Sequence, residues 1–405
     1  MMQARLLGCP DGEQKLLVVI HHMSVDGVSW RILLEDLEKA YQQLSQGEKV
    51  TLPLKTHSYL QWVEGLKAYG GDEELQEESR YWREVVLEEG VLPRELSERS
   101  EAGTKATYEE VRSVGRRLSK EHTQSLLQEV HGAYHTQMND LLLTALALTI
   151  REWSGRDAVV FELEGHGREE VIGLDVSRTV GWFTSVFPVR LRIEGKTYGD
   201  HLKHIKEHLR GIPHKGIGYG ILKYFGEEEN QSIFKSASAE IVFNYLGQMD
   251  SERQGGGLFQ SARDAIGASL DRKNFRAHRL EINSHISQGQ FEIEFGYSAK
   301  EYRDETLERV ASSYMSNLEA LIEHCRHKEI SEYTPSDVPL AELTQEELER
   351  SLQQVPEGGS VTTLYKLSPM QEGLLFTALY KDTDEYVVQG VYELEGEVDL
   401  AIFKQ

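Results

Sequence analysis

Cysteine, basic residues and long apolar runs are all scarce in this chain. Only two of its 405 residues are cysteines, so neither a disulfide framework nor a cysteine zinc site is expected. Lys and Arg together number 44 against 67 Asp and Glu, and the resulting net charge of −23 excludes the basic surface that nucleic-acid binding requires. No uninterrupted apolar run approaches the roughly 20 residues that span a bilayer. We therefore expect a soluble, cytoplasmic protein with no nucleic-acid and no membrane partner.

Two other patterns do not predict sites. His324, Cys325 and His327 are close in sequence, but they end a charged helical segment, and no metal site is expected. The run HKGIGYG at 214–220 has the glycines of a phosphate-binding loop, yet it does not follow a strand as a nucleotide-binding loop does. We therefore expect no bound nucleotide.

A pair of histidines ends the first strongly apolar segment. Leu16–Ile20 has the composition of a buried strand, and it leads through His21 and His22 into the helical pattern RILLEDLEKAYQQL. Neighbouring strand residues point to opposite faces, so the two imidazoles are expected to have different roles. One of them could act as a general acid or base, because histidine titrates close to neutral pH. A hydrogen-bonded pair at a strand end is the alternative.

A carboxylate ends a second apolar segment. Residues 157–163 are predicted to form a strand, and Glu164 follows where Gly165 and Gly167 allow a tight turn. Burial at this position would raise the pKa of Glu164 and let it exchange protons near neutral pH. The alternative is a solvated turn, because Arg168 and its two neighbours are charged.

Six segments in a fixed order carry a resemblance. They are HHMSVDGVSWRIL at 21–33, NDLLLTALALTI at 139–150, EGHGRE at 164–169, SRTVGWFTSVFPVRL at 177–191, HKGIGYG at 214–220 and FNYLGQ at 243–248. In them the chain resembles the epimerization domains of nonribosomal peptide synthetases, which belong to the condensation-domain superfamily. The resemblance implies an α/β, two-lobed fold like that of chloramphenicol acetyltransferase. HHxxxDG is common to the superfamily, whereas VSWRIL and EGHGRE resemble epimerases.

The resemblance also implies a reaction and its partners. The family inverts the α-carbon, from L to D, of an aminoacyl or peptidyl thioester. No cofactor is bound directly, since the substrate hangs on the 4'-phosphopantetheine of a peptidyl carrier domain, and adenylation and condensation domains are adjacent. His22 and Glu164 would be the catalytic residues on opposite sides of a channel. Which of them takes the proton from which enantiomer stays open.

Further residues are expected to support this site. Asp26 is expected to orient its loop through a backbone or arginine contact, Gly27 to let the chain bend, and Ser29 to cap the following helix. His21 would pack or hydrogen-bond behind the site. Asn244 and Tyr245 could reach the channel from a strand, where the tyrosine hydroxyl could donate to an enolate. Trp182, Thr184 and Ser185 would line the channel of the substrate arm, although the rings of Trp182 and Phe183 also suit core packing.

The predicted organisation has four parts. Residues 1–100 would be a remnant of the N-terminal lobe, with strands at 4–7 and 16–20, helices near 30–47, 57–69 and 73–89, and a connection at 93–105. Residues 101–328 would be the C-terminal lobe. Its predicted elements are a strand at 106–114, a helix from Ser119, a buried helix with N-cap Asn139 and stop Gly155, and an amphipathic helix over 304–324.

A linker and a second domain would follow. Residues 329–362 would form the linker, with a capping box from Thr344 to Glu347 and a Pro-Gly-Gly exit. Residues 363–405 resemble the start of a condensation domain, with a helix from Ser368 and a strand over 385–396. Relative to the family the N-terminal lobe is incomplete. Two alternatives to the epimerase therefore remain: a condensation-type acyltransferase that uses the same histidine, and a catalytically inactive fragment.

Overall fold

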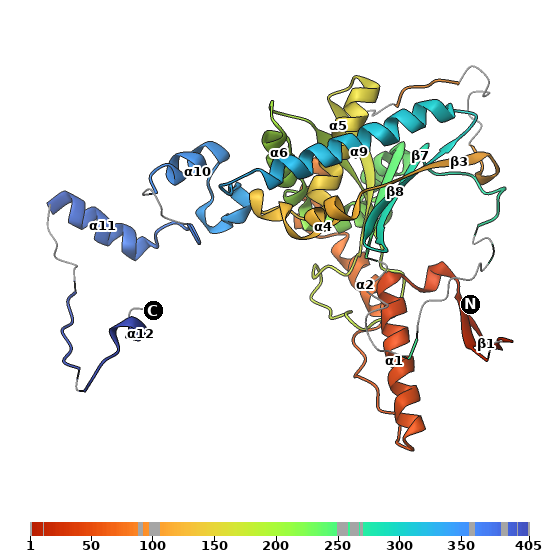
Figure 1. Ribbon diagram of the computed structural model, residues 1–405, viewed down its shortest axis with the longest axis horizontal. Coiled ribbons are helices and arrows are strands. Elements are labelled where there is room, and N and C mark those ends of the chain that lie inside the picture. The colour runs from red at the N-terminus through yellow and green to blue at the C-terminus, as the bar shows by residue number, and fades with distance from the viewer. Residues whose placement is uncertain are drawn as a thin grey trace. The chain divides into compact units, whose positions relative to one another are not determined.

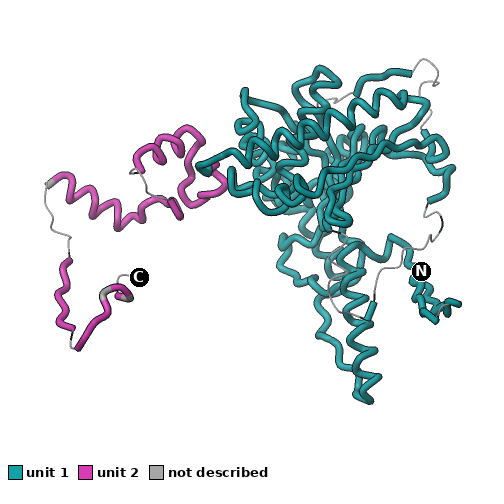
Figure 2. The backbone as a smooth tube through the Cα atoms, viewed as in Figure 1, with its two compact units in different colours: residues 1–332 teal, residues 333–405 magenta. Residues whose placement is uncertain are grey.

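The computed structural model describes residues 2–10, 12–87, 92–96, 106–248, 258–259, 267, 270–355, 361–381, 388–394 and 396–403. The chain divides into two compact units between Glu332 and Tyr333, which Figure 2 distinguishes by colour. The connection predicted at 93–105 is described only as far as residue 96, and the exit with Pro356, Gly358 and Gly359 lies outside the described residues.

The first unit opens with a hairpin and three helices. β1 (Met2–Gly8) pairs antiparallel with β2 (Gln14–Ile20), which confirms the predicted strand pair. The expected burial of Leu16–Ile20 is wrong, because Leu16 and Val19 are 38% and 56% exposed and β2 has only β1 as a neighbour among the described strands. A 3₁₀ turn, η1 (His22–Ser24), leads into α1 (Gly27–Ser45). α2 (Tyr59–Tyr69) and α3 (Glu73–Leu87) follow close to the predicted ranges.

A six-stranded mixed sheet forms the centre of this unit. Its strands are β3 (Val111–Arg117), β4 (Ala158–Gly165), β5 (Ser185–Arg192), β6 (Ile241–Gln248), β7 (Leu280–Ser287) and β8 (Gln290–Ser298), in the order β3-β8-β7-β6-β4-β5. β4, β6 and β7 run parallel to one another, and the other neighbours are antiparallel.

The predicted strand at 106–114 is wrong in its first half. Tyr108–Glu110 form a 3₁₀ turn, η3, and the strand begins at Val111. The reason lies outside the segment, because the N–H of Tyr108 donates to the carbonyl of Asn274 and Thr107 bridges Phe275. These partners are distant in sequence, so the local β-branched pattern does not reveal them.

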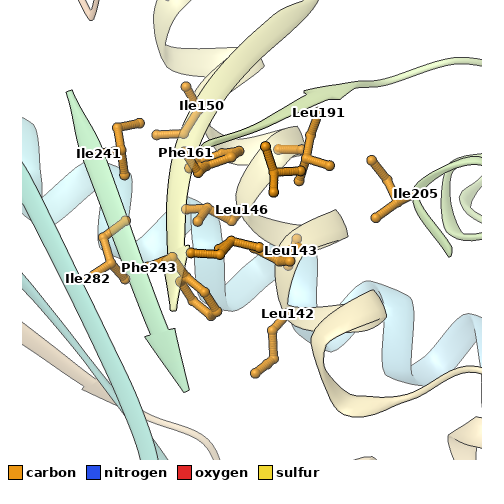
Figure 3. Close-up of a cluster of buried hydrophobic side chains, with 14 of the residues drawn as sticks. Leu142, Leu143, Leu146, Ile150, Phe161, Leu191, Ile205, Ile241, Phe243 and Ile282 are labelled. Carbon is orange, nitrogen blue, oxygen red and sulfur yellow. The ribbon is translucent and has the colours of Figure 1, made fainter. Parts of the chain in front are cut away.

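One face of the sheet carries the hydrophobic core. α5 (Met138–Ser154) and α9 (Asp304–Arg326) pack together against this face, with α4 (Lys120–Gln128), η4 (Val130–Ala133) and α6 (Tyr198–Arg210) beside them (Figure 1). α5 is buried on nearly every side from Asp140 to Ile150, as its apolar sequence predicts. In the close-up of Figure 3 its leucines at 143 and 146 lie beside core side chains of β4 and β6.

The ends of α5 test two predictions. Gly155 adopts a left-handed conformation (φ 69°) at the C-terminus, so the predicted stop is confirmed. Asn139 is not the N-cap. The helix begins at Met138 after Gln137, whose N–H donates to the carboxylate of Asp140 at 2.6 Å. Asp140 is fully buried and also bonds Arg210 on α6, so a tertiary contact fixes where the helix starts.

The helices around β5 complete the first unit. η5 (Pro213–Gly216), α7 (Ile217–Phe225) and α8 (Glu228–Ser236) follow α6. The indole of Trp82 in α3 packs against Phe187 in β5 and Tyr219 in α7, with ring centroids 6.3 and 5.4 Å apart. Trp62 and Trp82 belong to the same buried cluster as the sheet, so the core extends on both sides of residue 100.

The second unit is small. It contains η7 (Pro335–Asp337), η8 (Pro339–Ala341), α10 (Gln345–Leu352), α11 (Pro369–Lys381) and α12 (Leu400–Phe403). The predicted capping box from Thr344 to Glu347 is confirmed, as is the start of a helix after Ser368. The strand predicted over 385–396 is wrong for residues 388–394, which have no regular structure. Val388, Val391 and Tyr392 are exposed, and an apolar strand without a neighbour to pair with is not stable.

Among the described residues, no helix combines the length and the apolar character that a membrane crossing would need.

Candidate active site

The two histidines after β2 have different surroundings. His21 is the N-cap of η1, where its Nδ1 accepts the N–H of Met23 at 3.2 Å. His22 is exposed, and its ring meets that of Trp182 edge-on, with centroids 5.5 Å apart. His21 therefore holds the turn, whereas the imidazole of His22 is available to a ligand.

Asp26 connects the histidine segment to the sheet. It is the N-cap of α1, and its carboxylate accepts the N–H of Ser29 at 2.7 Å. The guanidinium of Arg168 donates to both carboxylate oxygens, at 3.1 and 3.0 Å. Burial by itself would raise the pKa of Asp26, but the hydrogen bonds from Ser29 and the positive charge of Arg168 outweigh it and lower the pKa. Asp26 thus makes both the backbone and the arginine contact expected of it.

One expectation, about Ser29, is wrong, and the alternative of a solvated turn does not hold at Arg168. Ser29 does not cap α1, because Asp26 does. The hydroxyl of Ser29 instead donates to the carbonyl of Gly181 at 2.9 Å. Arg168 does not lie in a solvated turn, since its side chain is 7% exposed and stacks 3.9 Å above the ring of Phe183. Sequence analysis misses this role because an arginine next to glutamates looks like a surface residue.

Glu164 is the last residue but one of β4. Phe161 and Leu163 point into the core, so Glu162 and Glu164 lie on the opposite face of the sheet. Glu164 keeps exposed surface, yet enough protein surrounds its carboxyl group that burial raises its pKa. Positive charge on His22 and His278 and a hydrogen bond from Asn244 partly offset this rise. The predicted direction of the pKa shift is confirmed, and His22 contributes to the electrostatics of this carboxyl group.

A pocket of about 380 Å³ lies at this carboxylate. Six of the predicted residues line it: Asp26, Gly27, Glu164, Thr184, Asn244 and Tyr245. Its far wall comes from the start of α5 and the end of α6, including Asp140 and Arg210. The size suits a small acyl group more than a folded partner.

The remaining predicted residues lie outside the pocket wall. They are His21, His22, Trp182 and Ser185. Phe183 is buried as a packing residue, whereas Trp182 keeps 44% of its surface exposed and is not part of the core. The hydroxyl of Ser185 is buried and finds no hydrogen-bond partner among the described residues.

β6 contributes two neighbouring side chains. The amide nitrogen of Asn244 donates to the side-chain oxygen of Asn283 on β7 at 3.1 Å. Its hydrogen bond to Glu164 lowers the carboxyl pKa, so the amide must be the donor there as well. Tyr245 packs partly against the core, and burial raises its pKa, which keeps the hydroxyl protonated as a donor.

The glycine-rich segment at 214–220 forms η5 and the start of α7. It follows the helix α6, whereas a nucleotide-binding loop follows a strand.

Family and sequence comparisons agree on the kind of domain. The model of the condensation domain family matches residues 1–344. One of the proteins that make up the linear gramicidin synthase of Brevibacillus parabrevis is 43% identical over 96% of this chain, which covers 5% of that protein. One of the proteins of the mycosubtilin synthase of Bacillus subtilis is 40% identical over 100% of the chain, which covers 15% of that protein. The chain thus spans a small part of these curated relatives.

Solved structures share the fold. The epimerization domain from the third module of tyrocidine synthetase B is 39% identical, with a TM-score of 0.71, and the match covers 81% of this chain and 73% of that one. The first condensation domain of the CDA synthetase is 18% identical, with a TM-score of 0.56 over 82% of this chain and 68% of that one. The α/β fold is therefore the chloramphenicol-acetyltransferase-like fold of condensation domains.

Proposed function

Because the chain belongs to the condensation domain family, we propose that it inverts the α-carbon, from L to D, of an aminoacyl or peptidyl thioester in nonribosomal peptide synthesis. The substrate would be carried on the phosphopantetheine arm of a peptidyl carrier domain. That arm belongs to the substrate, so no resident cofactor is needed. Adenylation and condensation domains adjacent to the carrier would be the other partners.

The reaction requires two groups that exchange protons around one carbon. A base takes the α-proton, and the electrons of the broken C–H bond form an enolate with the thioester carbonyl. An acid then forms a new C–H bond on the opposite face. His22 and Glu164 would be these groups, and the protonated hydroxyl of Tyr245 would donate to the enolate oxygen. A positioned proton-transfer group of this kind contributes about 10² to 10⁴ in rate.

The carboxylate of Glu164 is the observation that carries this proposal. It lies in the pocket, its pKa is raised by burial, and it is coupled to the charge of His22. A peptide-bond-forming acyltransferase has a use for the histidine but needs no second acid or base at this place. The similarity at 39% identity to an epimerization domain supports the same choice.

The test is isotope exchange in deuterated water. The chain is incubated with a carrier domain loaded with an L-aminoacyl or L-peptidyl thioester, and α-deuterium and D-product are measured by mass spectrometry and chiral chromatography. We expect both in the unmodified protein and a loss of about 10² or more in E164Q and H22Q.

A matched control removes the same charge from the same turn. Glu170 is exposed and does not line the pocket, so E170Q should keep the rate of the unmodified protein. Peptide-bond formation with an amine acceptor, and no exchange, would support the acyltransferase instead. Neither product would count against both activities.

A further inference from the structure

A second carboxylate lies beside Glu164 on the same face of β4. Glu162 precedes it by two residues, and side chains two apart in a strand lie about 7 Å apart on one face. The side chain of Glu162 is 15% exposed. An unpaired negative charge so close and so well buried would oppose the ionisation of Glu164.

Glu162 is not unpaired. The Nε2 of His278 lies 2.5 Å from its Oε2, and the imidazole is also 15% exposed. The sheet order explains the meeting, because β4, β6 and β7 are parallel neighbours. Phe161 is level with Ile241, and Ile241 with Leu280, so the residues just before β7 lie close to the level of Glu162 on β4.

The positive charge of His278 also acts on Glu164. It is one of two charges that lower the pKa of this carboxyl group, the other being that of His22 from the segment after β2. From β6, Asn244 contributes a hydrogen bond but no charge. The cation next to His278 is engaged elsewhere, since Arg279 pairs with Glu240 and Glu301. His278 is thus a charge that both carboxylates of β4 share.

We propose that His278 is a positioning residue of the active site: held by Glu162, it offsets the charge of that carboxylate and keeps Glu164 available as an ionised base. Its catalytic meaning rests on the epimerization proposed above. His278 itself touches no reacting atom, and its effect is exerted through the carboxylates of β4.

The test measures Glu164 directly. Protein labelled with ¹³C at the glutamate side chains is titrated by NMR, and the signal of Glu164 is assigned from its absence in E164Q. In H278Q the titration midpoint of Glu164 should rise by about half a pH unit or more, because Glu162 is left uncompensated. In the double variant E162Q/H278Q it should return toward the original value, because both charges are gone.

A structural role alone would not produce that rescue. The control is H122Q, which removes a histidine whose Nε2 lies 3.2 Å from Glu323, on α4 and α9, away from the pocket. It should leave the midpoint of Glu164 unchanged. The acid limb of the α-deuterium exchange rate should move with the midpoint in H278Q and return in the double variant.

A further measurement uses the unmodified protein and therefore does not depend on whether a variant folds. Its Glu164 signal should show a second inflection at the pH where the ¹⁵N signals of His278 titrate. An unshifted midpoint in H278Q, an unrescued double variant or the absence of that inflection would each overturn the proposal. Because the NMR titration needs no turnover, it decides the role of His278 even if the chain fails to exchange the α-proton. Such a failure would contradict the proposed epimerase activity alone.

Discussion

At the scale of single residues, the protein shifts the pKa values of Asp26 and Glu164 in opposite directions. Asp26 is enclosed by donors, so its pKa falls and it stays ionised. Glu164 is surrounded by protein with fewer donors, so its pKa rises and its proton can be exchanged. The first is suited to holding structure and the second to moving protons, because a group that must give and take a proton needs a pKa near the working pH.

The Asp26–Arg168 pair should contribute strongly to stability. Its side chains are 4% and 7% exposed, and Asn at position 26 still caps a helix. D26N should therefore lower the free energy of unfolding at pH 7 by about 3 to 5 kcal/mol, chiefly by leaving Arg168 buried without its partner. The difference should narrow as the pH falls through the lowered pKa of Asp26, where the unmodified protein loses the pair as well.

Urea unfolding at several pH values measures this effect. D36N is the control, because Asp36 pairs with Arg178 at 2.5 Å but both side chains are more than a quarter exposed. It should cost about 1 kcal/mol or less. Equal losses in the two variants would show that the burial of the Asp26 pair has no special weight.

Glu164 should lower stability at neutral pH. Its pKa is raised above the ordinary 4.5 in the folded state, so the native protein binds the proton more tightly than the unfolded chain does. The free energy of unfolding therefore falls as the pH rises through the window that opens near 4.5. E164Q should accordingly raise the melting temperature at pH 7 and have no such effect below about pH 4.

The exposed neighbour again supplies the comparison. E170Q should show no pH-dependent difference of this kind in the same melting series. A melting temperature of E164Q that is lower than that of the unmodified protein at pH 7 would contradict the assignment of Glu164 as a strained, functional carboxylate.

At the scale of elements, the turn after β4 contacts both the segment of Asp26 and the loop before β5. It carries Arg168 to Asp26 and passes against the loop before β5. Gly167 makes this possible, since its φ is 67° and a Cβ atom there would lie 1.7 Å from the carbonyl oxygen of Phe183. The backbone of Phe183 in turn donates to Asp26. A shift of this turn would therefore move all three segments.

Gly173 is a matched control for Gly167. Its φ is 65°, but a Cβ atom there would meet nothing within 4 Å. G173A should cost about 1 kcal/mol for the left-handed backbone alone. G167A should cost about 3 to 5 kcal/mol and lower α-deuterium exchange, because the loop at Phe183 must also move. Equal effects in unfolding and exchange would show that the close approach is unimportant.

At the scale of the whole molecule, the two units have separate cores. Every residue of the large buried cluster lies between Trp62 and Cys325, and the pocket draws its lining from residues 26–246. The second unit has its own small cluster around Val338, Ala341 and Leu348. All the residues that line the pocket therefore belong to the first unit.

A chain that ends at Glu332 should keep the main unfolding transition. We expect its free energy of unfolding, measured in urea, to match that of the full chain within about 0.5 kcal/mol, because its core loses no residue. Its α-deuterium exchange should also be retained. A markedly earlier transition would mean that residues after Glu332 support the first unit.

Most local structure could be predicted from the sequence. The hairpin, α2, α3, the buried α5 with its stop at Gly155 and the capping boxes depend on periodicity and on hydrogen bonds between residues a few positions apart. These features are determined by residues that lie close together in the chain.

Which polar groups meet depends on the tertiary structure. Asp26 and Arg168 are 142 positions apart, and Glu162 and His278 are 116 apart. The start of α5, the 3₁₀ turn at 108–110 and the irregular segment at 388–394 were mispredicted, the first two because their hydrogen-bond partners are remote. A charged or polar side chain looks the same in a sequence whether water or a distant partner satisfies it. The cost of burying it unpaired makes the partner decisive, and folding alone brings that partner into place.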